Sequence, residues 1–246
     1  MLKLTKRKKS KYELFTEQKS PASKRRHVGV EIEFYCDDNA NSLIDKFSEA
    51  KLDKYVTVKT DGSINPACGM YGHEINVLCL ETNYRNVLKR VCKVMVDAGG
   101  EVNRSCGLHI HLDMRHRDPK VIFNNLVVSQ PILYYMNPSS RAVSDYCIRT
   151  SSRELDDAHY EGRTGINACA YVRHETIEIR IHSGTINSRK ISRWVELLLT
   201  ISKKKLPVNN DQTTMGEFVK TFRVSKRLAS YVNNRIKNFN PDSNVA

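Results

Sequence analysis

Strict alternation of apolar and polar residues is the clearest pattern in the chain. It occurs in residues 28–34, 73–77, 107–112 and 176–181. Side chains two residues apart lie on the same face of a β-strand. In the first segment, valine, isoleucine and phenylalanine therefore occupy one face, while Gly29, Glu31 and Glu33 occupy the other. The pattern predicts four strands, each with one apolar face, and residues 55–58 are expected to form another strand.

Apolar residues with helical spacing lie between these strands, in residues 43–50, 83–98, 119–135 and 188–199. The expected N-caps are Asn41 or Ser42, Asp118 and Ser188. The third helix is expected to bend at Pro131. Together the segments predict an α+β fold, in which helices pack on the apolar face of a largely antiparallel sheet and leave the other face open.

The polar face of this predicted sheet has an unusual composition, because open sheet faces normally carry Thr, Lys, Ser and Gln. Here it carries Glu31, Glu33, Glu74, His109, His111, Glu178, Arg180 and His182. Carboxylates with imidazoles suit Mg²⁺ or Mn²⁺, and an arginine among them suits a phosphate. The alternatives are a solvated acidic face, surface histidines and a cross-strand salt bridge of the Glu-x-Arg type. No P-loop motif occurs, so a nucleotide would be held in another way.

Charge is unevenly distributed along the 246 residues, whose net charge is +13. Residues 1–26 have a net charge of +8, residues 203–246 have +6, and residues 27–202 have −1. This predicts a basic N-terminal arm (1–26), one globular domain (27–202) and a basic helical C-terminal extension (203–246). The basic ends either contact nucleic acid or another polyanion weakly, or serve as solubilising tails.

The cysteines and the hydrophobic runs indicate the compartment. Seven cysteines occur without a C-x-x-C pair, which fits neither a disulfide framework nor a structural zinc site. No apolar run approaches the ~18 residues of a membrane-spanning helix, and no secretory signal is recognisable. We therefore expect a cytoplasmic protein. The polar residues 137–162 are expected to form a functional loop or lid.

The order of the motifs resembles that of the amidoligase family, within the glutamine synthetase-like carboxylate–amine ligases. The matching motifs are Glu31-Ile32-Glu33, Asp61-Gly62-Ser63 with a later Glu74, Cys106-Gly107-Leu108-His109-Ile110-His111, and Asn167 followed by Glu178-Ile179-Arg180. Each motif is short, and it is their order and spacing that carry the resemblance.

The resemblance implies a glutamine synthetase-like catalytic domain, with a curved sheet that wraps the site, and an ATP-dependent ligase activity. In such enzymes ATP phosphorylates a carboxylate to an acyl phosphate, which an amine then attacks to give an amide. Two or three Mg²⁺ or Mn²⁺ ions assist. The carboxylate and amine substrates are not identified by any motif, and some family members form oligomers.

The resemblance also implies a role for each matching residue. Glu31, His109 and Glu178 would hold the metal that orients the ATP phosphates. Glu33 and Glu74 would hold a second metal near the acyl phosphate. The remaining roles are nucleotide contact for His111 and Asn167, stabilisation of the transferring phosphoryl group for Arg180, and catalysis for Glu33 and Asp61, where Asp61 either orients the amine or only forms a turn.

Two other functions remain open from the sequence. His-x-His with carboxylates also builds the water-activating site of metal-dependent hydrolases and nucleases, whose nucleic acid the basic ends could hold. Alternatively, the chain is a non-catalytic nucleic-acid-binding protein on a ligase-like scaffold.

Overall fold

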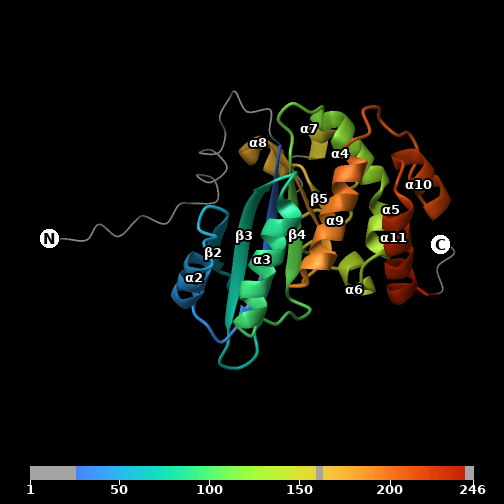
Figure 1. Ribbon diagram of the computed structural model, residues 1–246. Helices are drawn as coiled ribbons and strands as arrows, with labels where there is room; N and C mark the ends of the chain where they lie inside the picture. The colour runs from blue at the N-terminus through green and yellow to red at the C-terminus, as the bar shows by residue number, and fades with distance from the viewer. Residues whose placement is uncertain (1–25, 159–162, 242–246) are drawn as a thin grey trace.

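A six-stranded antiparallel sheet forms the centre of the molecule (Figure 1). The computed structural model describes residues 26–158 and 163–241. The strands are β1 (His27–Cys36), β2 (Val56–Thr60), β3 (Tyr71–Leu80), β4 (Gly107–Asp113), β5 (Ile166–Asn167) and β6 (Thr176–Ser183). Their order is β2-β3-β1-β4-β6-β5. The predicted α+β fold with an antiparallel sheet is confirmed, and the short β5 is an addition to the predicted strands.

The helices are α2 (Ala40–Glu49), α3 (Tyr84–Asp97), α4 (Pro119–Val128), α5 (Gln130–Tyr135), α6 (Ser139–Ala142), α7 (Leu155–Ala158), α8 (Cys169–His174), α9 (Ser188–Ile201), α10 (Met215–Phe222) and α11 (Lys226–Phe239). Asp118 caps α4 as predicted. The caps of α2 and α9 are Asn39 and Asn187, so the predictions for these two ends were wrong by one to three residues.

The predicted helix at 119–135 is two helices rather than one bent helix. Ser129 separates α4 from α5, and Pro131 lies in the first turn of α5. Proline is tolerated there because the first N–H groups of a helix have no partner within the helix. The bend expected at Pro131 is therefore a break before it.

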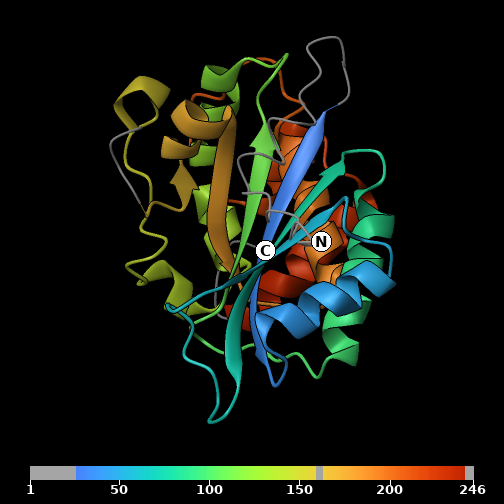
Figure 2. The same cartoon turned by 90° about the vertical axis from the view of Figure 1, so that its left-hand side faces the viewer.

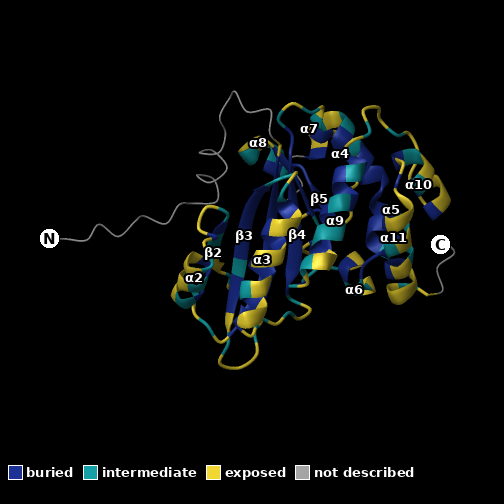
Figure 3. Cartoon of the chain, viewed as in Figure 1, coloured by how far each residue is buried: buried dark blue, intermediate teal, exposed yellow. Residues whose placement is uncertain are grey.

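The core lies between the sheet and a layer of helices. The apolar face of β1 contributes Val28, Val30, Ile32 and Phe34, each at most 1% exposed. Helices α3 and α9 pack against each other over this face, and α9 places the fully buried Trp194 in the same core. Figure 3 shows the central strands buried, and helices such as α3 and α11 with both buried and exposed residues. Figure 2 shows the other face of the sheet, with the orange and red helices behind the strands.

The region after residue 202 packs on the same core. Buried apolar residues of α10 and α11 belong to the main hydrophobic cluster: Phe218, Phe222, Leu228, Val232 and Ile236. Nε of the buried Arg235 also donates a hydrogen bond of 3.0 Å to the carbonyl of Met136. The predicted N-terminal arm, except for Arg26, lies outside the described residues.

A β-bulge changes the orientation of the end of β6. The register between β4 and β6 shifts by one residue between Leu108 and Ile110, which places His182 opposite the apolar Leu108. A one-residue shift turns a side chain to the opposite face. His182 accordingly packs on Trp194 of α9, with ring centroids 5.0 Å apart. The prediction that His182 shares the polar face with Glu178 and Arg180 was wrong.

Among the described residues, no helix has the length and apolar character needed to cross a membrane. All seven cysteines lie in the described part of the chain, and none forms a disulfide.

Candidate functional site

The strand register brings the polar positions of five strands together on one face of the sheet. The neighbouring pairs are Glu31 with Asn76 and His109, Glu33 with Glu74, His111 with Glu178, and Asn167 with Glu178. Side chains directly opposite each other on one face lie ~5 Å apart at their Cβ atoms. The candidate residues therefore form a continuous group. Most of its members are buried, so this face is more enclosed than the open face that the sequence predicts.

The first cluster consists of Glu31, His109 and Glu178, whose candidate ligand atoms lie within 4.8 Å of one another. Nδ1 of His109 is 3.3 Å from Oε2 of Glu31 and 3.6 Å from Oε1 of Glu178. Burial, followed by the nearby charge of Arg180, lowers the pKa of His109 to about 4. The imidazole is therefore neutral at pH 7, which is the form that binds metals.

The second cluster consists of Glu33, Asp61 and Glu74, also within 4.8 Å of one another. Oε2 of Glu33 accepts a hydrogen bond of 2.6 Å from the backbone N–H of Gly107. Asp61 lies just after β2 and accepts a 2.8 Å hydrogen bond from the backbone N–H of Ser63. Since Asp61 and Glu74 are half-buried, this cluster lies nearer to solvent than the first one.

The buried negative charge of the two clusters favours the binding of divalent cations. Glu31, Glu33 and Glu178 are each at most 8% exposed, and Nη1 of Arg180 contacts Glu178 at 2.8 Å. Burying several carboxylates together costs several kcal/mol per ion unless positive charge compensates them. The buried Oδ1 of Asn76, next to Glu31, also has no hydrogen-bond partner. A hard cation would offset the charge and take carboxylate and amide oxygens as ligands.

His111 and Asn167 hold the carboxylates of the first cluster in place. Nε2 of His111 lies 2.6 Å from Oε1 of Glu31, and its Nδ1 lies 3.0 Å from Oγ1 of Thr176. Nδ2 of Asn167 donates a 2.8 Å hydrogen bond to Oε2 of Glu178. Partners of this kind fix the orientation of a ligand carboxylate. Their predicted contact with a nucleotide stays a prediction.

Glycine is required at position 107 by close packing. A Cβ atom there would lie 2.7 Å from Nε2 of His109 and 3.3 Å from Oε2 of Glu33. These two side chains belong to different clusters, so Gly107 gives both of them room at the point where the clusters meet.

A pocket of about 150 Å³ adjoins Glu33 and His109, and it is rich in arginine. Arg104, Arg141 and Arg180 line it together with three serines. The guanidinium of Arg180 is held in place, since its Nε donates a 3.1 Å hydrogen bond to the carbonyl of Tyr146. Guanidinium groups with hydroxyls bind phosphate or carboxylate oxygens. The pocket can therefore hold an anionic group beside both clusters.

Sequence reasoning missed Arg104 and Arg141 as members of this site. Arg104 lies in the turn before β4 and Arg141 in the short α6, so neither belongs to a periodic pattern. The nearest signal was the expectation of a functional loop at 137–162. Ser144 and Tyr146 from this segment do line the pocket, while residues 159–162 lie outside the described residues.

Comparison with known families relates the second half of the chain to one of them. Residues 133–202 match the model of a family described as "Putative amidoligase enzyme". The matched segment includes Asn167, Glu178 and Arg180 but begins after the motifs on β1, β3 and β4. The match confirms the resemblance to amidoligases and supports an enzyme of ligase type. The comparison with curated proteins gives no significant match.

Proposed function

We propose that this protein is an ATP-dependent carboxylate–amine ligase with a glutamine synthetase-like catalytic domain. The observation that carries the proposal is the juxtaposition of two acidic clusters with an arginine-lined pocket on one face of an antiparallel sheet. The match of residues 133–202 to an amidoligase family supports the same reading. Metal-bound phosphates with a guanidinium beside them are the usual requirement of phosphoryl transfer.

Each cluster then holds a Mg²⁺ or Mn²⁺ ion, with a third ion accommodated if the nucleotide brings one. Glu31, His109 and Glu178 hold the ion at the nucleotide phosphates. Glu33 and Glu74 hold the ion nearer the acceptor carboxylate. The ions supply positive charge that offsets the charge of the phosphate oxygens.

The proposed reaction has two stages, and protein side chains assist both. A carboxylate oxygen of the substrate first takes the γ-phosphoryl group of ATP, and ADP leaves. The amine nitrogen then attacks the acyl carbon, the C–O bond to phosphate breaks, and inorganic phosphate leaves as the amide forms. Arg180 faces the transferring group and stabilises its charge without reorganisation. Asp61, at the more exposed cluster, orients the amine and takes its proton.

The proposed substrates are a carboxylate and an amine of unidentified structure. The proposed compartment is the cytoplasm, where ATP is available. Measuring ADP release against panels of carboxylates and amines, with and without Mg²⁺ or Mn²⁺, tests the activity. We expect release that requires both the metal and a carboxylate.

Two variants connect this activity to the site. Glu33→Gln and His109→Ala should reduce metal-dependent ATP use by at least ~100-fold, because each removes a metal ligand. Circular dichroism should show an unchanged fold. Glu49→Gln, at an exposed position on α2, is the matched control and should keep full activity.

Two results would contradict the proposal. Wild-type protein that binds neither metal nor nucleotide by calorimetry excludes a ligase of this kind. Cleavage of nucleic acid without ATP would instead favour the metal-dependent hydrolase.

A further inference from the structure

Three arginines from three helices converge on one carboxylate on the helical side of the molecule. The carboxylate oxygens of Glu196 (α9) lie 2.9 Å from Nη2 of Arg85 (α3), 2.7 Å from Nη1 of Arg193 (α9) and 3.6 Å from Nη2 of Arg227 (α11). Burial alone would raise the pKa of Glu196, but hydrogen bonds from Arg193 and Arg85 outweigh burial and lower it. The group therefore holds one negative and three positive charges at neutral pH.

A pocket of about 430 Å³ opens beside these arginines and has no acidic residue in its lining. The lining consists of Arg85, Lys89, Arg189, Arg193 and Arg227, with Ser188 and Ser192. Ser188 and Arg189 begin the 14-residue helix α9, whose N-terminal end carries partial positive charge. Every side chain in this lining can donate a hydrogen bond to an anion.

A role in fixing the helices accounts for only part of this lining. The contacts with Glu196 explain Arg85, Arg193 and Arg227 as a clamp between α3, α9 and α11. Lys89 and Arg189 line the same pocket, yet neither has an ion-pair partner among the described residues. The pocket therefore carries more positive charge than Glu196 offsets, and a cleft lined by one sign of charge concentrates ions of the other sign.

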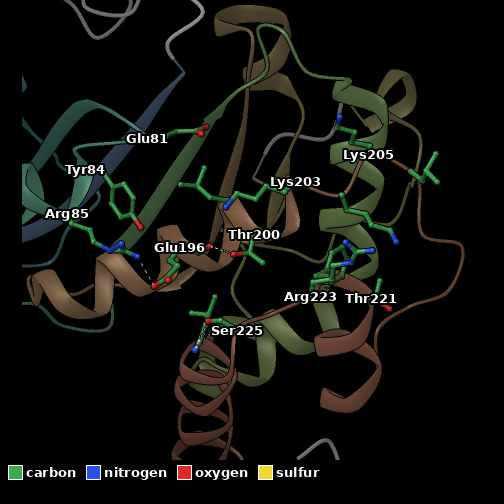
Figure 4. Close-up of a pocket in the computed structure, with 15 residues that line it drawn as sticks. Glu81, Tyr84, Arg85, Glu196, Thr200, Lys203, Lys205, Thr221, Arg223 and Ser225 are labelled. Atoms are coloured by element: carbon green, nitrogen blue, oxygen red, sulfur yellow. Dashed lines mark hydrogen bonds and ion pairs between the residues drawn. The ribbon is translucent and has the colours of Figure 1, made fainter.

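A larger pocket of about 860 Å³ continues from the first and shares Arg85 with it. Figure 4 shows Arg85 beside Glu196 at one end of this pocket, with Lys205 and Arg223 toward the other end. The three consecutive lysines 203–205 line it, together with the hydroxyl residues Thr200, Thr221 and Ser225. Its two acidic residues are already paired with arginines, Glu81 with Arg117 and Glu196 with the three arginines named above. The positive surface is therefore extended, and it is larger than a single phosphate needs.

We infer that the two pockets form one binding surface, on the helical side of the sheet and away from the acidic clusters, for an anion that carries several closely spaced phosphate groups. The aromatic residues of the larger pocket, Tyr84 and Phe222, are only 5% and 4% exposed. They offer no platform on which bases could stack. Recognition is then of the phosphates themselves, whether in free polyphosphate or in the backbone of a nucleic acid.

Binding to the full-length chain tests this inference with two probes. One is inorganic triphosphate in calorimetry, and the other is a labelled single-stranded oligonucleotide in fluorescence anisotropy. We expect at least one of them to bind, and the one that binds identifies the source of the phosphates. Absence of binding for both overturns the inference. Orthophosphate that competes as well as triphosphate also overturns it, because the site would then hold a single phosphate.

A double variant locates the site. Lys89→Gln with Arg189→Gln should weaken binding about tenfold at low salt, and for the oligonucleotide should reduce the slope of log Kd against log salt by about 1.4. The matched control, Lys51→Gln with Lys237→Gln, removes the same charge at exposed positions outside both pockets. Equal weakening by variant and control would mean that binding follows net charge alone, and would overturn the assignment. ADP release by the double variant should be unchanged, so this result is independent of the proposed ligase activity.

Discussion

His182 illustrates how a buried histidine is kept neutral in this fold. Its Nδ1–H donates a 2.6 Å hydrogen bond to the carbonyl of Ser183, so its Nε2 is free to accept from Arg235 at 3.4 Å. Both ring nitrogens are thus satisfied in the neutral form, and the ring packs on Trp194. Burial, and then the charge of Arg235, lower the pKa of His182 to about 3.

This lowered pKa predicts that acid destabilises the protein through His182. An unfolded histidine has a pKa near 6.5, so between about pH 6.5 and pH 3 the unfolded state binds more protons than the folded state. The free energy of unfolding should therefore fall by about 2 kcal/mol from pH 7 to pH 5 on account of this residue. Chemical denaturation of wild type and His182→Gln at both pH values measures this, and the variant should lack that part of the decrease. The same decrease in both proteins would contradict the assignment.

Arg180 gives a prediction about catalysis. Lysine at this position keeps the charge but loses the planar fork that contacts both Glu178 and the Tyr146 carbonyl. We expect Arg180→Lys to lower kcat by about 100-fold while the Kd for nucleotide changes little, because in the proposed reaction the arginine acts mainly in the transition state. Steady-state kinetics and calorimetry separate the two effects. Arg153→Lys, at an exposed ion pair with Asp211, is the control; a Kd that rises as much as kcat falls would refute this role.

At the scale of elements, alternation along single strands predicted most of the sheet and most of the candidate site. Period-two alternation determines which face a residue takes, so Glu31, Glu33 and His109 could be grouped before any fold was known. The bulge between β4 and β6 could not be predicted, because it depends on pairing between strands, and for this reason His182 was placed on the wrong face. Arg104 and Arg141 reach the site from a turn and a short helix, where no periodic pattern exists.

The start of β4 also gives a prediction. An added methyl at Gly107 would meet Nε2 of His109 at 2.7 Å, so Gly107→Ala must displace the imidazole or the neighbouring Glu33. We expect metal affinity to fall by about 10- to 100-fold, as for other changes that misorient ligands, with little loss of helical signal in circular dichroism. Gly216→Ala on α10, where a Cβ would meet nothing within 4 Å, is the control. Unchanged Mn²⁺ binding in Gly107→Ala would place the metals elsewhere.

At the scale of the whole molecule, the sheet separates the two acidic clusters from the basic surface. One face gathers buried carboxylates, while the helices on the other side present arginines and lysines from α3, α9 and α11. Part of the net charge of +13 thus lies in a defined surface rather than only in the ends of the chain. The same C-terminal region that contributes to this surface also covers the core.

Removal of residues 203–246 should therefore unfold the protein rather than trim an independent tail. The chain beyond residue 202 buries Phe218, Phe222, Leu228, Val232 and Ile236 in the main cluster. At ~1.5–3 kcal/mol per buried side chain, their burial contributes roughly 10 kcal/mol before the entropy of ordering is subtracted, comparable with the ~5–15 kcal/mol of a whole domain. We expect a chain ending at residue 202 to lack a cooperative thermal transition and to be digested rapidly by protease.

Single substitutions separate packing from charge in this region. Ile236→Ala should lower the free energy of unfolding by about 2–5 kcal/mol, because it leaves a cavity under α11. Lys237→Gln, the exposed neighbouring position, should change it by less than about 0.5 kcal/mol. Denaturant titrations measure both values. Equal stability of Ile236→Ala and wild type, or a cooperative transition at the wild-type temperature in the shortened chain, would show that residues 203–246 fold apart from the sheet. Arg85 of α3 lines one pocket with Arg223 and the other pocket with Arg227. Loss of the packing of residues 203–246 would therefore also divide the basic surface.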